Sequence, residues 1–298
     1  MKNAFQSLVN DQKENGGPLA KVSTSSSQAR NYPYLVCFHG CLMSDFLGYA
    51  GLFFVAVIAG AVNSVAGGGT LISFPSLVVF GEADIVSNAT NTAALWPGSL
   101  SSALGYRKDT EMRRDLLILL LVPSIIGGLL GALILVVTPE STFRFVVPFL
   151  ILFATILFAG RKFFARRFAD KSVQAQVTLP GRIWGFFFQL FVATYGGYFG
   201  AGIGILMLGS LSVMGLRDIH VMNALKTVLA ALINVTAFVF FAYKGLVVWP
   251  LAIMMAIGAI IGGYMGARGA KRVNENYLQL FVITVGVVVS SWFIIRLV

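Results

Sequence analysis

The sequence predicts an all-α polytopic membrane protein of about ten transmembrane segments, arranged as a 5+5 inverted repeat. Three observations indicate this class: an apolar composition, a series of apolar segments near bilayer length, and glycine-rich interruptions at matching places in two halves. The chain has 298 residues, of which 57% are hydrophobic and only 11% are charged. Soluble domains carry about 25% charged residues. The composition therefore excludes an ordinary soluble domain and predicts the lipid bilayer as the surroundings.

The formal net charge is +10, which raises the question of nucleic-acid binding. The basic residues gather in short loops between apolar segments, as the positive-inside rule expects of a membrane protein. No basic face with interleaved aromatic residues is visible, so we expect no nucleic-acid partner. We expect a multi-pass protein of the cell (inner or plasma) membrane.

Residues 1–43 are polar and low in complexity, and we expect a disordered N-terminal tail. Met43 directly precedes the membrane region and is a candidate alternative start. Cys37, His39 and Cys41 lie close together in this tail, but a closed structural zinc site takes four ligands. We therefore expect neither a metal nor a cofactor.

The apolar segments follow the tail in order. Residues 44–165 form the predicted first repeat, 166–181 a basic cytoplasmic linker, and 182–298 the second repeat. Most segments approach the ~20 residues that span a bilayer. The short ones need the glycine-rich stretch before them, which predicts short broken helices there. The expected segments are 46–63, 69–81, 87–105, 115–137, 143–163, 183–200, 203–215, 220–243, 246–268 and 276–297.

Two distant patches recur at nearly the same offset, which indicates an internal duplication. The stretch Ile125–Ala132 reappears 135 residues later as Ile260–Ala267, with three glycines in common positions. Asn88 and Thr92 likewise reappear as Asn223 and Thr227. Within the first patch, glycines four residues apart allow close approach of helix backbones. We expect these pairs, Gly127 with Gly131 and Gly262 with Gly266, to serve helix packing only.

Five segments per repeat is an odd number, so the second repeat should be inverted in the membrane. The loop at 106–114 carries four basic residues, whereas its counterpart carries only Lys244. The loop at 138–144 has one arginine offset by an acid, whereas its counterpart at 268–272 has three bases. Equivalent loops thus exchange charge, as inversion requires. Ten crossings place all basic loops on the cytoplasmic side. A rival count of eight, with the short segments re-entrant, places 268–272 outside.

Glycine-rich stretches interrupt both repeats at matching places. The first is Asn63–Pro75, which contains three consecutive glycines, and the second is Tyr195–Gly204. Freed backbone groups cannot face lipid, so such breaks belong where the chain faces protein or a water-filled cavity. A helix that begins after a break points its N–H groups at the gap and favours an anion. The alternative is that the glycines only permit tight packing.

Lys226 is a cation inside an apolar segment that contains no acidic residue. A buried cation there needs a partner, and an anionic substrate would supply one. The alternative is a lysine that reaches to the headgroups. Its counterpart Asn91 lies in the amide-rich run 87–92, whose side chains either add donors or bond neighbouring helices. The predicted substrate-binding residues are Asn63, Gly67, Gly68, Gly69, Thr70, Asn88, Asn91, Gly202, Gly204, Asn223, Lys226 and Thr227.

The stretches Asn63–Pro75 and Ser87–Ser99 resemble the sulfite exporter TauE/SafE family of membrane permeases, and so do Asp218–Thr227 and Gly245–Pro250. The resemblance covers about residues 44–298. The second glycine stretch departs from the first because it lacks three consecutive glycines. The resemblance implies transport of small sulfur-containing anions such as sulfite or organosulfonates.

These observations predict a permease or exporter that moves a small anion by alternating access, and not an enzyme. The segments contain no Walker A, HExxH, GxSxG or CxxC motif. The run Gly200–Gly204 is no dinucleotide fingerprint, because it lacks the strand and the acidic residue which that site requires. Two alternatives remain open: a passive anion channel, and a membrane-embedded subunit or assembly partner without its own transport. Homo-oligomerisation is also open.

Overall fold

The computed structural model describes residues 42–106, 114–168, 179–214, 216, 219–269 and 275–297. Residues 1–41 of the predicted disordered tail, with Cys37, His39 and Cys41, lie outside these ranges, as does the centre of the predicted linker at 169–178. Residues from Met43 onward form one compact unit.

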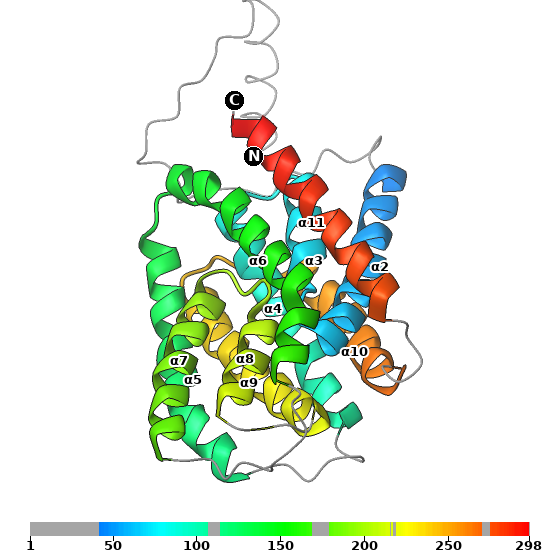
Figure 1. Cartoon of the computed structure of the whole chain (residues 1–298). Coiled ribbons are helices and arrows are strands. Elements are labelled where there is room, and N and C mark those ends of the chain that lie inside the picture. The colour runs from blue at the N-terminus through cyan, green and yellow to red at the C-terminus, as the bar shows by residue number, and fades with distance from the viewer. Residues whose placement is uncertain are drawn as a thin grey trace, which may run out of the picture. The chain divides into compact units, whose positions relative to one another are not determined.

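The described residues form ten helices and contain no strand (Figure 1). Each predicted apolar segment corresponds to one helix, and the ends agree within five residues. The helices are α2 (Leu42–Ala66), α3 (Thr70–Phe80), α4 (Asp84–Tyr106), α5 (Arg114–Val137), α6 (Glu140–Phe168), α7 (Leu179–Tyr198), α8 (Ile203–Val213), α9 (Ile219–Tyr243), α10 (Trp249–Gly269) and α11 (Glu275–Leu297).

Six of the described helices, α2, α5, α6, α9, α10 and α11, are long and apolar enough to cross a bilayer. Large apolar side chains cover the outside of several helices, among them Phe54, Ile118, Phe145, Phe187 and Ile295. In water this surface would be unfavourable, but lipid solvates it. The all-helical architecture of a multi-pass membrane protein is therefore confirmed.

The two short helices fold back along the helices that precede them. After the turn at Gly67–Gly69, α3 returns beside α2: Gly69 lies against Ala59, and the Phe80 ring lies against Gly48. In the second half, α8 returns along α7, so that Ile203 lies beside Gly196, and Met214 beside Gly185. Each glycine break therefore forms the bend of a helical hairpin inside the protein.

Small residues bring long helices into backbone contact, as the glycine patterns predict. Gly131 of α5 packs on the backbone of α7 at Thr194. In the other half, Gly262 and Gly266 of α10 pack on Val57 and Ala61 of α2. A Cβ at any of these glycines would overlap the neighbouring backbone. The glycines thus set how closely these helices approach each other.

Two pairs of helices, α6 with α11 and α4 with α9, pack antiparallel to each other. Near the start of α11, Gln279 donates to the carbonyl oxygens of Phe158 and Ala159, near the end of α6. Further along α11, Gly286 meets Thr155, so α6 and α11 run in opposite directions (Figure 1). Helices α4 and α9 also pack together. Trp96 stacks on Phe238 late in α9, whereas Ser102 shares a cavity with residues early in α9.

Candidate functional site

The two glycine breaks meet in the interior of the helical unit. A Cβ built on Gly67 would lie 2.7 Å from the Cα of Gly204. A Cβ built on Gly204 would lie 2.9 Å from the Cα of Gly67 and 3.2 Å from Cδ of Lys226. The backbones of the two breaks therefore touch, and Lys226 lies directly beside the contact.

A small cavity adjoins this contact. It is bounded by α2, α4, α8 and α9, and therefore by elements of both halves. Its lining combines hydroxyl and amide side chains with one lysine and two glycines, and none of the residues that line it is acidic. The lining residues are Asn63, Ser64, Gly67, Ser99, Ser102, Ile203, Gly204, Lys226, Thr227 and Ala230.

Lys226 is the charged group of this cavity. Only 2% of the residue is exposed, and its Nζ donates a hydrogen bond of 3.3 Å to the carbonyl oxygen of Ser64 in α2. The side chain thus crosses from α9 to the end of α2 instead of extending along α9 towards an aqueous boundary. In a medium of low dielectric constant, a cation held here strongly favours an anion beside it.

Polar side chains from three helices surround the lysine. Asn63 Nδ2 donates to Ser99 Oγ over 3.1 Å, which joins α2 to α4. The hydroxyl groups of Ser102 and Thr227 donate to backbone carbonyl oxygens within their own helices, Ser102 to Gly98 and Thr227 to Asn223 and Ala224. Hydroxyl groups that hold their own helix carbonyls can redirect their protons towards an oxyanion at little cost, because each keeps lone pairs and a rotatable O–H bond.

The start of α8 adds a partial positive charge. Its first residues, Ile203 and Gly204, line the cavity, and no side chain caps its N-terminus at Gly202. The helix macrodipole places roughly half a positive charge at such an end. The start of α3 also lacks a side-chain cap, but its first residue, Thr70, is not among the lining residues. The electrostatic contribution of the two short helices to this cavity is therefore unequal.

The structure brings together five of the twelve predicted residues: Asn63, Gly67, Gly204, Lys226 and Thr227. The other seven do not line the cavity, although most of them lie near the breaks.

Among these seven, Asn91 contacts α3, where it accepts from Ser73 and donates to Thr70 over 3.5 Å. Asn88 donates to the carbonyl oxygen of Tyr198 over 2.9 Å. The remaining positions are Gly68 beside Phe158, Gly69 beside Ala59, Gly202 beside Ala154, and Asn223 one turn before Thr227.

Sequence reasoning missed three hydroxyl groups of the lining, those of Ser64, Ser99 and Ser102. Ser99 and Ser102 are three residues apart in α4 and therefore share a face. They follow directly after Pro97-Gly98, a pair that weakens a helix and leaves backbone carbonyl groups in need of partners. A pair of serines at helical spacing after such a break is the sequence feature that could have identified these lining residues.

The chain is similar to known proteins over most of its length. The sulfite exporter TauE/SafE family profile matches residues 52–293. This chain belongs to that family. The matched region contains every residue that lines the cavity and both glycine breaks. No solved structure matches the chain.

Three curated relatives of this TauE/SafE protein carry the name "probable membrane transporter protein". "Probable membrane transporter protein ORF9" of Sinorhizobium sp is 28% identical over 244 residues, covering 80% of this chain and 89% of the relative. A "probable membrane transporter protein" of Haemophilus influenzae is 26% identical, covering 80% of this chain and 92% of the relative. "Probable membrane transporter protein YfcA" of Escherichia coli K12 is 25% identical, covering 80% and 87%.

Proposed function

We propose that this TauE/SafE protein is a permease of the cell membrane that moves a small oxyanion, of the sulfite or organosulfonate class, by alternating access. The buried Lys226 beside the contact of the two helix breaks is the observation that supports this proposal most directly. One cation, one helix N-terminus and several hydroxyl groups match the donors that a small oxyanion needs. The family name adds the sulfur chemistry.

Alternating access is supported by the way corresponding helices pack. We infer a 5+5 inverted repeat in which α2–α6 and α7–α11 correspond one to one. Helices α4 and α9, and α6 and α11, pack antiparallel, as the corresponding members of inverted repeats should. The glycine contacts of α5 on α7 have counterparts in those of α10 on α2. A site between two such halves can be exposed to either side when one half rocks against the other.

Flux in proteoliposomes that contain the purified protein tests the proposal. The anions are sulfite, thiosulfate, sulfate and two organosulfonates. Lys226→Gln removes the buried cation, and Lys244→Gln removes an exposed lysine at the end of α9 as a matched control. A charged hydrogen bond contributes about 1.5–3 kcal/mol. We therefore expect Lys226→Gln to lower flux at limiting substrate by about 30-fold, the equivalent of 2 kcal/mol, and Lys244→Gln to leave it unchanged.

The outcomes separate the proposal from the two alternatives. Saturable flux that is accelerated by the same anion on the far side supports alternating access. Flux proportional to concentration, without that acceleration, indicates a passive channel. Absence of flux for every anion, together with co-purification of a stoichiometric partner, indicates a subunit of a larger assembly. Flux that survives Lys226→Gln would remove Lys226 from the site.

A further inference from the structure

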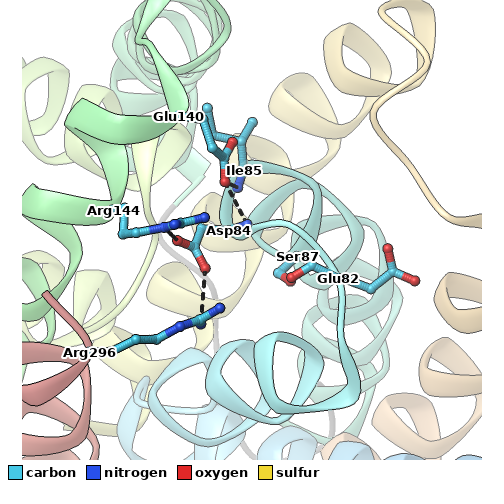
Figure 2. Close-up of polar contacts among 7 residues, drawn as sticks. All are labelled: Glu82, Asp84, Ile85, Ser87, Glu140, Arg144 and Arg296. Carbon is cyan, nitrogen blue, oxygen red and sulfur yellow. Dashed lines mark hydrogen bonds and ion pairs between the residues drawn. The ribbon is translucent and has the colours of Figure 1, made fainter. Parts of the chain in front are cut away.

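A buried carboxylate, Asp84, joins three helix ends at one face of the helical unit. Asp84 is the first residue of α4 and is only 1% exposed. Its Oδ2 accepts a hydrogen bond of 3.0 Å from Nε of Arg144, in the second turn of α6. Its Oδ1 lies 3.8 Å from Nη1 of Arg296, at the end of α11. Figure 2 shows the two arginines converging on Asp84 from opposite sides.

Glu140 holds the backbone of the same helix end. Its Oε1 accepts from the N–H groups of Asp84 and Ile85, at 2.7 and 3.3 Å. This carboxylate therefore caps the N-terminus of α4 from the first turn of α6, where the helix macrodipole also favours a negative charge. Together, Glu140 and Arg144 attach α4 firmly to α6, and both helices belong to the first half.

Arg296 is the member of this network that comes from the second half. Its distance of 3.8 Å exceeds a hydrogen bond, whereas that of Arg144 does not. If α11 moved away, Asp84 would keep Arg144 as its partner, so the buried carboxylate would not be left uncompensated. The contact between Asp84 and Arg296 is therefore the one that can open at low cost.

An aromatic cluster lies directly beneath this network. Phe74 of α3 stacks on Phe293 of α11, with ring centroids 5.9 Å apart, and meets Phe199 edge-on at 5.3 Å. It also meets Phe143, the residue before Arg144. The rings of Phe74, Phe143, Phe199 and Phe293 are at most 2% exposed. Two of the contacts of Phe74 join the first half to the second.

The cavity lies on the far side of this aromatic cluster from Asp84. Ser99 and Ser102 line the cavity and, at about 1.5 Å per residue, stand about 22 to 27 Å along α4 from Asp84. Phe74 stands one turn after the start of α3, between the break and the end of α3 near Asp84. From the cavity towards the face of Asp84, the chain therefore presents first the Gly67–Gly204 contact, then the aromatic rings, and then the ion pairs.

We propose that Asp84, Arg144 and Arg296, with the rings of Phe74, Phe199 and Phe293, form a gate that closes the transport pathway at this face. The gate is closed in the structure, and release of Arg296 from Asp84 opens it. Helices α3 and α11 then separate, and the cavity becomes accessible from the face of Asp84. The inference rests on the proposed function, because a gate of this kind requires a pathway between the two halves.

Cysteine accessibility tests the gate without any substrate. In a background with Cys37→Ser and Cys41→Ser, Ala230→Cys reports on the cavity and Ala83→Cys marks the face of Asp84. A membrane-impermeant thiol reagent is applied to intact cells and to inverted vesicles. We expect Ala230→Cys to react slowly from the side on which Ala83→Cys reacts. Arg296→Gln and Asp84→Asn should each raise that rate by about tenfold or more, as a shift of population towards the open state.

Two variants serve as controls. Arg296→Lys keeps the positive charge, so the rate should stay close to that of the parent. Glu82→Gln removes a carboxylate that points away from the cluster (Figure 2) and should leave the reaction rate of Ala230→Cys unchanged. The gate is refuted if the parent reacts equally fast from both sides. It is also refuted if Arg296→Gln leaves the rate unchanged while the protein elutes as a folded species. Both outcomes refute the gate whether or not the protein transports a sulfur oxyanion.

Discussion

Glu82 lies between α3 and α4, two residues before Asp84. Burial raises the pKa of the Glu82 carboxyl above its ordinary value. The folded protein therefore binds this proton more strongly than the unfolded chain does. The resulting stabilisation is fully present below the unfolded pKa, and it is lost as the pH rises through the folded pKa. At neutral pH, an ionised Glu82 is thus held in an unfavourable environment.

We expect Glu82→Gln to raise the thermal unfolding midpoint in detergent at pH 7 and to leave it nearly unchanged at pH 4, where the glutamate is already largely protonated. Lys244→Gln, which replaces an exposed lysine just after α9, is the control. Equal shifts of the Glu82→Gln midpoint at both pH values would show that the effect arises from packing and not from ionisation.

The sequence predicted the location of some residues of the site and not of others. Lys226 stood out because a cation in an apolar helix is costly, and the structure places it in the cavity. Asn91 lies 135 residues before Lys226 in the sequence, and it bonds Ser73 and Thr70 of α3. Amide side chains bond in either direction and to many partners, so their spacing alone does not fix their neighbours. Ser99 and Ser102 were difficult to predict for a similar reason, because a hydroxyl group also donates and accepts hydrogen bonds and has many possible partners.

At the scale of the elements, the contact of Gly67 with Gly204 depends on the absence of side chains. Gly67 has φ +77°, a conformation that costs an L-residue about 1–2 kcal/mol. A methyl group there would also overlap Gly204, and overpacking typically costs about 1–3 kcal/mol. Gly204 carries only the second cost, since it lies within α8. We expect Gly67→Ala to destabilise more than Gly204→Ala, as measured by thermal unfolding midpoints.

Gly209→Ala is the matched control for that comparison. Gly209 also lies in α8, but a Cβ there meets nothing within 4 Å. Alanine should therefore stabilise the helix slightly, by up to about 1 kcal/mol. Equal midpoints for Gly67→Ala and Gly209→Ala would mean that the breaks can move apart freely, and that their contact does not constrain the two hairpins.

The helices themselves were predictable because a bilayer leaves the backbone few choices. A segment of about 20 apolar residues must form a helix to satisfy its N–H and C=O groups. The charged interruptions and the glycine breaks then set the ends. The local sequence pattern did not predict which helices pack against each other. The packing of α4 on both α9 and α10 joins segments more than 100 residues apart, and it depends on side-chain fit that spacing does not encode.

At the scale of the whole molecule, the direction of each helix decides which loops share a side of the membrane. Because α3 folds back on α2 and α8 on α7, each hairpin starts and ends towards the same side. The helices that follow, α4 and α9, then start from opposite sides. This order gives the same loop positions as ten alternating segments. The eight-crossing count differs, because it puts the region after α10 on the side of Thr138 and puts Lys244 on the opposite side.

Labelling of single cysteines in intact cells tests this arrangement. Thr138→Cys follows α5, and Lys244→Cys follows α9. Both should react with an impermeant reagent from outside. Gly269→Cys, at the end of α10, should react only after the membrane is opened, because its loop carries the basic residues that the positive-inside rule keeps in the cytoplasm. A Cβ at Gly269 meets nothing within 4 Å, so the substitution should be tolerated. Reaction of Gly269→Cys from outside, with Lys244→Cys reacting only after the membrane is opened, would replace the inverted repeat with the eight-crossing arrangement. It would also place the Asp84 network on the same side as the basic loop.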